Sequence, residues 1–342
     1  MKAKPTLKEL MDITQLSRAT IDRALNDRPG VHARTRRAVE AAVRQLSTGA
    51  PERTPPQRRS RNSVRTFRVI AQSGDAFTDE LTRTALELTT EFAAAGAQLE
   101  IVRCVGAPDE QVAERVREVA LQADGIAIIC TNTPVITAAL REAKEAGKAV
   151  ATLITDVDAD ARHTYLGVNN RAAGQSAAFL IGRHLERHPS PEVAVVVATF
   201  SYTCHEDREI GFRSLLRQRF PNVNLVEVIK GADSGAATYE ATCRLLDVHA
   251  NLDGIYNVAG GNEGLVLALR ERGLTGKTLY VTHEVNRVTE PLLRSDAIDY
   301  LLTQDLKRLL RTTVENLLAV LAGASVASHA FIPIETYSRY SL

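Results

Sequence analysis

Cysteine, tryptophan and long apolar runs are scarce in this sequence. The 342 residues include four cysteines, two methionines and no tryptophan. Cys104, Cys130, Cys204 and Cys243 form no CxxC pair and have no histidine at zinc-ligand spacing, so we expect buried or free thiols and no metal site. No apolar stretch of ~18 residues is present to span a bilayer, and no secretion signal opens the chain. These absences favour the reducing cytoplasm.

Recognisable catalytic motifs are also missing. Gly260 and Gly261 do not form a GxGxxG fingerprint, no acidic residue stands at the spacing that a dinucleotide site needs, and no GxxxxGKS/T loop occurs. His205 and His283 have no serine or cysteine nucleophile motif nearby. The sequence therefore predicts neither a catalytic residue nor a cofactor.

Charge is divided unevenly along the chain. Residues 1–66 contain 15 Lys and Arg against 6 Asp and Glu, whereas residues 67–342 contain 27 against 35. A basic head on an acidic body favours binding of a polyanion by the head. A solvated basic tail would have the same composition, so composition alone leaves both interpretations open.

The N-terminal region has helical periodicity three times over. Apolar residues recur at helical spacing between Thr6 and Leu46, with Thr6 and Ser17 at cap positions, which predicts a compact all-α head over residues 1–46. Residues 47–66 contain three prolines, many arginines and almost nothing apolar. That composition is typical of a linker, so we place a domain boundary there.

From residue 67 onward, short apolar runs alternate with amphipathic helical stretches. Nine runs are typical of strands covered on both faces, at 67–71, 99–102, 125–130, 149–154, 193–198, 225–228, 254–258, 279–281 and 300–302. The alternation predicts an α/β body over residues 67–342 with doubly wound parallel sheets. So many strands indicate two lobes, about 67–165 plus 303–328 and about 166–302 plus 329–342.

The most specific pattern lies between Thr6 and Leu46. The residues Leu16, Ser17, Thr20, Ile21, Arg23, Leu25 and Asn26, followed by Val31, Thr35, Arg36 and Val39, match a known motif without a gap. The segment resembles the helix-turn-helix head of the lactose-repressor and galactose-repressor family. This resemblance implies a sequence-specific DNA-binding transcription regulator.

The resemblance assigns DNA contacts residue by residue. The base-reading residues would be Arg18, Ala19, Asp22 and Arg23, on a helix placed in the major groove. Phosphate contacts would come from Thr6, Ser17, Thr20, Asn26, His32 and Arg34. Thr6 and Ser17 would equally serve as helix caps, and that alternative stays open.

The connection between head and body departs from the family pattern. Family members insert a leucine from a short hinge helix into the minor groove, and no leucine occurs between Leu46 and Phe67. Arg53, Arg58, Arg59 and Arg61 could replace it by contacts to the DNA backbone, and a flexible solvated tether is the alternative.

The body resembles the ligand domain of the same family, which shares its fold with periplasmic sugar-binding proteins. The resemblance rests on Asp207-Arg208, Gly211-Phe212, Gln304-Asp305 and the segment 256–264. It implies a cleft between the lobes for a sugar, polyol or sugar acid. The effector-binding residues would be Asp75, Phe77, Asp156, Arg208, Asn257, Asn262, Glu284 and Gln304.

The resemblance therefore predicts a cytoplasmic, dimeric regulator that binds a near-palindromic operator and responds to a small sugar-like effector. Two alternatives come from other classes. The first is a solute-binding protein without DNA function, against which the missing signal peptide and the added head count. The second is an α/β enzyme, which the missing cofactor and nucleophile motifs oppose.

Overall fold

The computed structural model describes residues 6–14, 16–26, 35, 39, 42–43, 64–231 and 233–342. The chain divides into two compact units, residues 1–61 and 62–342. Within the described ranges, none of the helices has both the length and the hydrophobicity that a membrane span requires. The larger unit contains both lobes and the cleft between them.

The smaller unit contains helices α1 (Leu7–Thr14) and α2 (Arg18–Leu25). Thr6 and Glu9 cap α1 reciprocally: the Thr6 amide donates to the Glu9 carboxylate at 2.7 Å, and the Glu9 amide donates to the Thr6 hydroxyl at 3.3 Å. The Ser17 hydroxyl caps α2 by accepting from the Thr20 amide. Residues 35, 39, 42 and 43 are also helical. A small apolar core consists of Leu10, Ile21, Ala24, Val39 and Ala42.

The first lobe is built on a six-stranded sheet in the order β11-β5-β4-β3-β1-β2. Its strands are β1 (Arg65–Ala71), β2 (Ala97–Arg103), β3 (Gly125–Ile129), β4 (Ala149–Leu153), β5 (Thr164–Gly167) and β11 (His329–Phe331). All neighbouring pairs are parallel. The helices are α4 (Asp75–Glu87), α5 (Thr89–Ala94), α6 (Asp109–Gln122), α7 (Pro134–Glu145), the short η1 (Ala159–Ala161) and α13 (Leu306–Leu321).

The second lobe has a sheet of the same size, in the order β12-β10-β9-β8-β6-β7. Its strands are β6 (Glu192–Val197), β7 (Asn224–Lys230), β8 (Gly254–Asn257), β9 (Leu279–His283), β10 (Tyr300–Thr303) and β12 (Glu335–Tyr337). Only the short β12 is antiparallel to its neighbour. The helices are α8 (Asn170–Leu185), α9 (Thr203–Arg219), α10 (Gly235–Val248), α11 (Asn262–Glu271) and α12 (Thr289–Arg294).

The central strands of each sheet are buried on both faces, which explains their near-continuous apolar sequences. In β1, Phe67, Val69 and Ala71 face one apolar core, and Ile70 faces another on the opposite side. The two faces of the second sheet are divided in the same way, with Ala194 and Val196 on one side and Val193 and Val195 on the other. The two-lobed α/β fold with parallel sheets is therefore as predicted.

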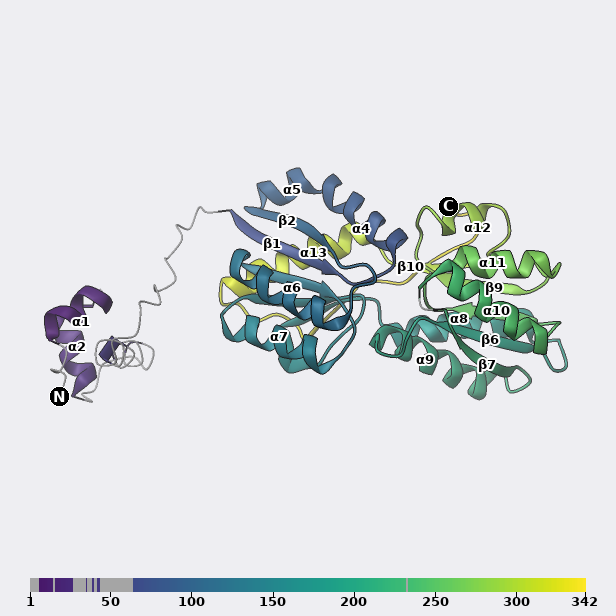
Figure 1. The fold of residues 1–342 in the computed structure, drawn as a ribbon, viewed down its shortest axis with the longest axis horizontal. Coiled ribbons are helices and arrows are strands. Elements are labelled where there is room, and N and C mark those ends of the chain that lie inside the picture. Colours follow the sequence, from purple (N-terminus) through teal and green to yellow (C-terminus); the bar gives the residue numbers. More distant parts are fainter. Residues whose placement is uncertain are drawn as a thin grey trace. The chain divides into compact units, whose positions relative to one another are not determined.

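The chain crosses between the lobes three times, after β5, after β10 and between β11 and β12. Figure 1 shows the result: α13, drawn in yellow, lies with the blue elements of the first lobe, whereas the C-terminus lies in the second. The lobe bounds differ from the expected ones at the C-terminal end. Residues 329–331 pair with β5 of the first sheet, and β10 belongs entirely to the second. Such short edge pairings depend on contacts that are distant in sequence.

Candidate functional site: a polar cleft between the lobes

A cavity of about 780 Å³ lies between the two lobes. Its wall is formed by segments that follow strands of both sheets, namely 72–77, 105–107, 154–155, 198–205, 233–235, 258–263 and 283–288. The carboxyl ends of parallel strands meet at one edge of a sheet, and that edge is where open α/β sheets bind ligands. The two lobes thus direct their ligand-binding edges toward a common space.

The first-lobe wall is held by hydrogen bonds around Gln72. Its amide nitrogen donates to the Asp109 carboxylate at 2.9 Å, and its amide oxygen accepts from the Thr131 backbone amide at 3.0 Å. Asp75 begins α4 at the rim, where Arg103 binds its carboxylate at 2.8 Å. Phe77 is half-buried and lines the same wall. This side of the cavity therefore offers a carboxylate and an aromatic ring on a rigid support.

Arg208 is the central cation of the second-lobe wall. It lies in α9 and is 3% exposed, so the packing of the second lobe holds its side chain in place. Its Nε donates to the Asn170 side-chain oxygen at 2.9 Å and its Nη1 to the Val258 carbonyl at 3.0 Å. Its Nη2 has no hydrogen-bond partner among the described residues and lies 4.0 Å from Glu284 Oε1. One nitrogen of a pre-oriented guanidinium thus remains for a ligand.

Glu284 faces Arg208 from the end of β9. Thr303 and Gln304 donate hydrogen bonds to its carboxylate, both at 3.1 Å. Burial raises the pKa of Glu284, and the opposing charge of Arg208 lowers it in part. Its backbone has φ = 64°, an unusual conformation for a residue with a side chain. The surrounding contacts keep this acceptor in place at the cavity wall.

Asn262 is oriented by a buried network behind the wall. Its side-chain oxygen accepts from the hydroxyls of Tyr280 at 2.6 Å and Thr282 at 2.8 Å, and from the Asn257 amide at 3.0 Å. Three donors on one oxygen fix which way the amide points. The amide nitrogen is then left as the group that Asn262 can offer to a ligand.

Two buried histidines complete the second-lobe wall. His205 lies three residues before Arg208 in α9, and His283 ends β9, where its Nε2 lies 2.7 Å from the Tyr256 hydroxyl. Burial lowers the pKa of His205 to about 4, with Asp233 opposing and Arg208 adding to the shift. Burial also lowers the pKa of His283 well below its usual value. Both rings are therefore neutral near pH 7.

The cavity brings together five of the effector residues predicted from sequence: Asp75, Phe77, Arg208, Asn262 and Glu284. Asn257 and Gln304 do not line it and instead support Asn262 and Glu284 from behind. Sequence reasoning missed several wall residues, among them Tyr202, His205, Asp233, Glu263 and Arg287.

Asp156 was misplaced. It follows β4, but Arg162 takes both of its carboxylate oxygens at 2.5 Å, and the Thr152 hydroxyl donates to it at 2.6 Å. Asp156 is not among the residues that line the cavity. The expectation that polar residues after a strand face the ligand fails here, because the buried Arg162, six residues later, binds the Asp156 carboxylate.

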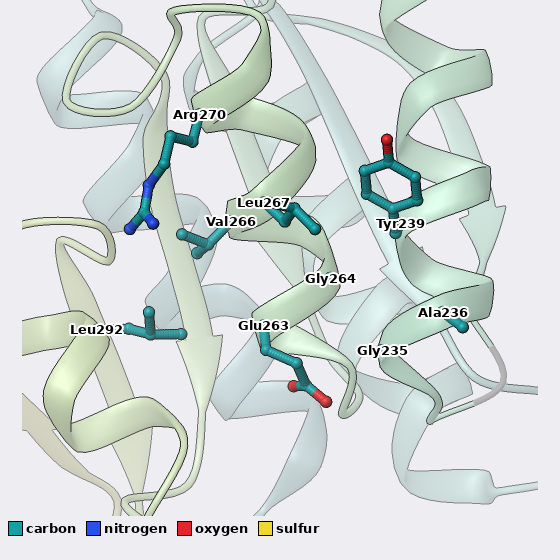
Figure 2. Close-up of a pocket in the computed structure, with 9 residues that line it drawn as sticks. All are labelled: Gly235, Ala236, Tyr239, Glu263, Gly264, Val266, Leu267, Arg270 and Leu292. Atoms are coloured by element: carbon teal, nitrogen blue, oxygen red, sulfur yellow. The ribbon is translucent and has the colours of Figure 1, made fainter.

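A second hollow of about 640 Å³ lies within the second lobe. Figure 2 shows its walls: Tyr239 and Ala236 come from α10, Val266 and Leu267 from α11, and Leu292 from α12. The lining is mainly apolar, with Glu263 and Arg270 as its charged members. It lacks the converging donors and acceptors of the cleft, so the cleft is the better candidate for a polar ligand.

The residues assigned to DNA contacts lie in the smaller unit. Arg18, Ala19 and Arg23 are exposed on α2, while the Asp22 carboxylate accepts from the Asn26 amide at 2.9 Å. Thr6 and Ser17 act as helix caps, and the Thr20 hydroxyl contacts that of Ser17 at 2.8 Å. His32, Arg34 and the linker arginines Arg53, Arg58, Arg59 and Arg61 lie outside the described residues. Individual DNA contacts by these side chains stay untested predictions.

A family model described as "Periplasmic binding protein domain" matches residues 69–325. No curated protein sequence matches the chain. Many solved structures do. One is the solute-binding protein of an ABC transporter from Burkholderia graminis C4D1M in complex with D-arabinose, with a TM-score of 0.75, 22% identity and coverage of 82% of this chain and 97% of that one.

Two further structures have the same fold at lower identity. The glucose-galactose binding protein of Geobacillus stearothermophilus has a TM-score of 0.74 at 16% identity, covering 82% of this chain and 99% of its own. A periplasmic solute-binding protein of an ABC transporter from Actinobacillus succinogenes 130z, with bound D-allose, has a TM-score of 0.72 at 16% identity, covering 81% and 98%. At such identities the likeness establishes the fold alone.

These findings correct several predictions. Membership of the lactose-repressor and galactose-repressor family is wrong, because the matching model is that of periplasmic binding proteins. The DNA-binding regulator, its operator and its homodimer are wrong on the same ground, since the family that matches is one of periplasmic binding proteins. The predicted cytoplasmic location is wrong because the matching domain is that of periplasmic proteins.

One prediction about activity agrees with the comparisons. The chain was expected not to be an enzyme, and the matching family and structures are binding proteins. Its two lobes, its central cleft and the match over residues 69–325 lead to one assignment. This chain belongs to the periplasmic binding protein domain family.

Proposed function

We propose that this chain is a sugar-binding protein that holds a neutral monosaccharide in the cleft between its lobes. The observation that carries the proposal is the set of pre-oriented groups around Arg208, Asn262 and Glu284, each held by a second layer of hydrogen bonds. A hydroxyl-rich ligand needs donors and acceptors at several points, because each buried hydroxyl that lacks a partner costs free energy. Similar proteins with bound D-arabinose and D-allose support this ligand class.

The charges of the wall favour a neutral ligand over a sugar acid. The carboxylates of Asp75, Asp233, Glu263 and Glu284 line the cavity, where the guanidinium groups are those of Arg208 and Arg287, and Arg103 binds Asp75. Arg287 is engaged outward with Asp79 at 3.2 Å. A ligand carboxylate would therefore meet an excess of negative charge, and like charges in a low-dielectric site repel strongly.

We assign the individual contacts as follows. Arg208 Nη2 donates to a ligand oxygen, Glu284 and Asp75 accept from hydroxyls, and the Asn262 amide donates to a further hydroxyl. Phe77 contacts an apolar face of the sugar ring. These roles are supported by the side chains' positions on the cavity wall. Because two of the similar proteins are components of ABC transporters, we propose the same kind of partner here.

We also propose a three-part division of the chain: a three-helix head over residues 1–46, a linker over 47–66 and the ligand-binding body over 67–342. Support for the head comes from α1, α2 and the apolar cluster that includes Val39 and Ala42. Limited proteolysis tests the division. Stable fragments that begin between residues 47 and 66 are expected, and a first cut inside the body would contradict it.

Calorimetric titration of the full chain tests the proposed function. We expect at least one of D-arabinose, D-allose, D-glucose and D-galactose to bind, and D-glucuronate to bind more weakly than D-glucose. Arg208→Met should weaken binding by about 30-fold or more, because a charged donor to a ligand oxygen is lost. Arg171→Met is the matched control, since Arg171 is exposed on α8 and pairs with Asp207 at 2.8 Å.

The outcomes separate clearly. Absence of binding for every neutral sugar by the folded wild-type chain would overturn the proposed function. Tighter binding of the uronate than of its neutral parent would overturn the neutral-ligand assignment. Circular dichroism and thermal melting of Arg208→Met establish that a loss of binding does not come from unfolding.

A further inference from the structure

His205 stands out among the cavity residues because its ring is buried and incompletely hydrogen bonded. The residue is 6% exposed and lines the cleft. Its Nδ1 has no partner at hydrogen-bond distance among the described residues. The neighbouring ring of Tyr202 lies 5.2 Å away between centroids and packs at a tilt, which fixes the plane of the imidazole. A buried polar ring of this kind needs a partner from elsewhere.

The surroundings determine what kind of partner His205 can take. A neutral imidazole has one N–H donor and one acceptor nitrogen. The backbone of Thr199 raises the pKa of His205 in part, which is the effect of a carbonyl that favours the ring N–H, so we assign the N–H to that side and the acceptor nitrogen to the ligand. The acceptor nitrogen of the ring has no group that donates to it, and a sugar hydroxyl can supply that donor.

Helix geometry places His205 beside the central cation of the site. His205 and Arg208 are three residues apart in α9, so their side chains project from the same face. Arg208 Nη2 is a donor without a partner, and His205 contributes an acceptor without one. A hydroxyl group is both donor and acceptor, so one hydroxyl between them satisfies both residues.

We propose that His205 is a specificity-determining residue: its imidazole accepts a hydrogen bond from one ligand hydroxyl, whose oxygen accepts from Arg208. The inference rests on the proposed function and adds a requirement to it. The ligand must carry a hydroxyl at this position, and a deoxy or O-methyl analogue is rejected. Sites that hydrogen-bond a hydroxyl discriminate strongly, because its removal leaves buried groups unpaired.

The charged and titratable groups around the ring agree with a neutral acceptor. Arg208 lies on the same helix, Asp233 faces it from the loop before α10, and His283 faces it from the end of β9. Burial and Arg208 lower the pKa of His205, while Asp233 raises it in part. The imidazole therefore remains an acceptor at the pH of a binding measurement near 7.

The test is a cycle between protein variants and monodeoxy analogues of the sugar that binds the wild-type full chain. For one analogue, we expect the wild type to lose about 10- to 100-fold in affinity relative to the parent sugar. His205→Phe, which keeps a ring but has no acceptor, should weaken the parent sugar by a similar factor and discriminate against that analogue by less than about threefold. His205→Gln, which retains an acceptor, should keep more of the discrimination.

A matched control is His188→Phe, since His188 is half-exposed after α8 and does not line the cavity. If His205→Phe binds the parent sugar as the wild type does, or weakens every analogue by the same factor, this inference fails while the proposed function stands. If no sugar binds the wild type, both fail. Should His205→Phe not fold, discrimination by His205→Ala equal to that of the wild type would overturn the inference.

Discussion

Asp156 and Arg162 form an ion pair in the first lobe, in which the arginine is buried and the carboxylate is partly exposed. Arg162 is 3% exposed, and besides Asp156 it donates to the Ser328 carbonyl at 2.8 Å, just before β11. The pair thus fastens the end of β4 to the segment that returns to the first sheet. Removing Arg162 leaves the partly buried Asp156 carboxylate without its closest cation, which costs part of the penalty of an unpaired buried charge.

We therefore expect Arg162→Leu to destabilise the body by about 1–3 kcal/mol, because the Asp156 carboxylate loses its charged donor but keeps the Thr152 hydroxyl and the Val157 amide. The double variant Arg162→Leu with Asp156→Leu should recover part of this loss. Urea unfolding followed by circular dichroism measures both. A cost below about 1 kcal/mol for the single variant would contradict the structural role and return Asp156 to consideration as a ligand residue.

The position of each site residue relative to the strands explains which of them a sequence can predict. Asp75, Arg208 and Glu284 come after strands or match a motif, and each lines the cleft. Asn257 and Gln304 have the same sequence signal but turn behind the wall, because neighbouring side chains rather than ligand satisfy them. His205 and Asp233 have no signal of their own, since the packing of α9 and of the loop before α10 brings them to the cavity.

Helices α8 and α9 pack unusually closely, and glycines make this approach possible. A Cβ atom added to Gly174 in α8 would lie 1.9 Å from the Arg208 carbonyl oxygen. One added to Gly211 in α9 would lie 2.2 Å from the Arg171 carbonyl oxygen. Each helix therefore has a glycine against the backbone of the other. The position of Arg208 relative to α8 and to the cavity therefore depends on this close contact between the two helices.

Gly174→Ala should separate the two helices and destabilise the body by about 2–3 kcal/mol, as overpacking does. The added methyl group would meet the backbone of Arg208 itself. A shift of α9 therefore displaces the Arg208 side chain, so the variant should also weaken sugar binding. Gln175→Ala, one residue along on the exposed face of α8, is the control and should change stability by less than about 0.5 kcal/mol. Equal unfolding midpoints for both variants would show that α8 and α9 tolerate a wider spacing.

Elements with long buried faces were predictable, and short ones were not. The nine apolar runs all fall on strands, because burial on both faces leaves a continuous apolar signal in the central strands and a mainly apolar one in the edge strands β2 and β7. β5, β11 and β12 were missed. They have only three or four residues each, and they are strands because distant segments pair with them. Local pattern does not encode such pairing.

At the scale of the whole molecule, the two lobes touch across the cleft as well as through their crossings. The Asn132 amide donates to the Ser201 carbonyl at 2.8 Å, and the Tyr202 hydroxyl donates to the Gln72 carbonyl at 2.9 Å. At the rim, Arg287 of the second lobe binds Asp79 of the first at 3.2 Å, and Arg103 binds the same carboxylate at 2.7 Å. These contacts must break before a ligand can leave a closed cleft.

Arg287→Ala should speed sugar dissociation by up to about fivefold, the range that an exposed ion pair can supply. Dissociation from the wild type should also accelerate with NaCl, because salt screens this pair, whereas the variant should respond less. Stopped-flow measurement over a salt series tests this. Arg294→Ala is the control, since Arg294 pairs with Glu290 within α12. Identical salt dependence of wild type and Arg287→Ala would refute the role of this pair.

The three crossings have a consequence for the order in which the molecule is made. A chain emerges from the ribosome N-terminus first, and domains fold as they become complete. The first lobe begins at residue 64, yet its core requires Leu309, Leu310, Val314 and Leu317 of α13. The second lobe has five of its six strands between residues 192 and 303. The second lobe can therefore bury most of its core before the first lobe does, because one apolar face of the first sheet remains only partly covered until α13 has been made.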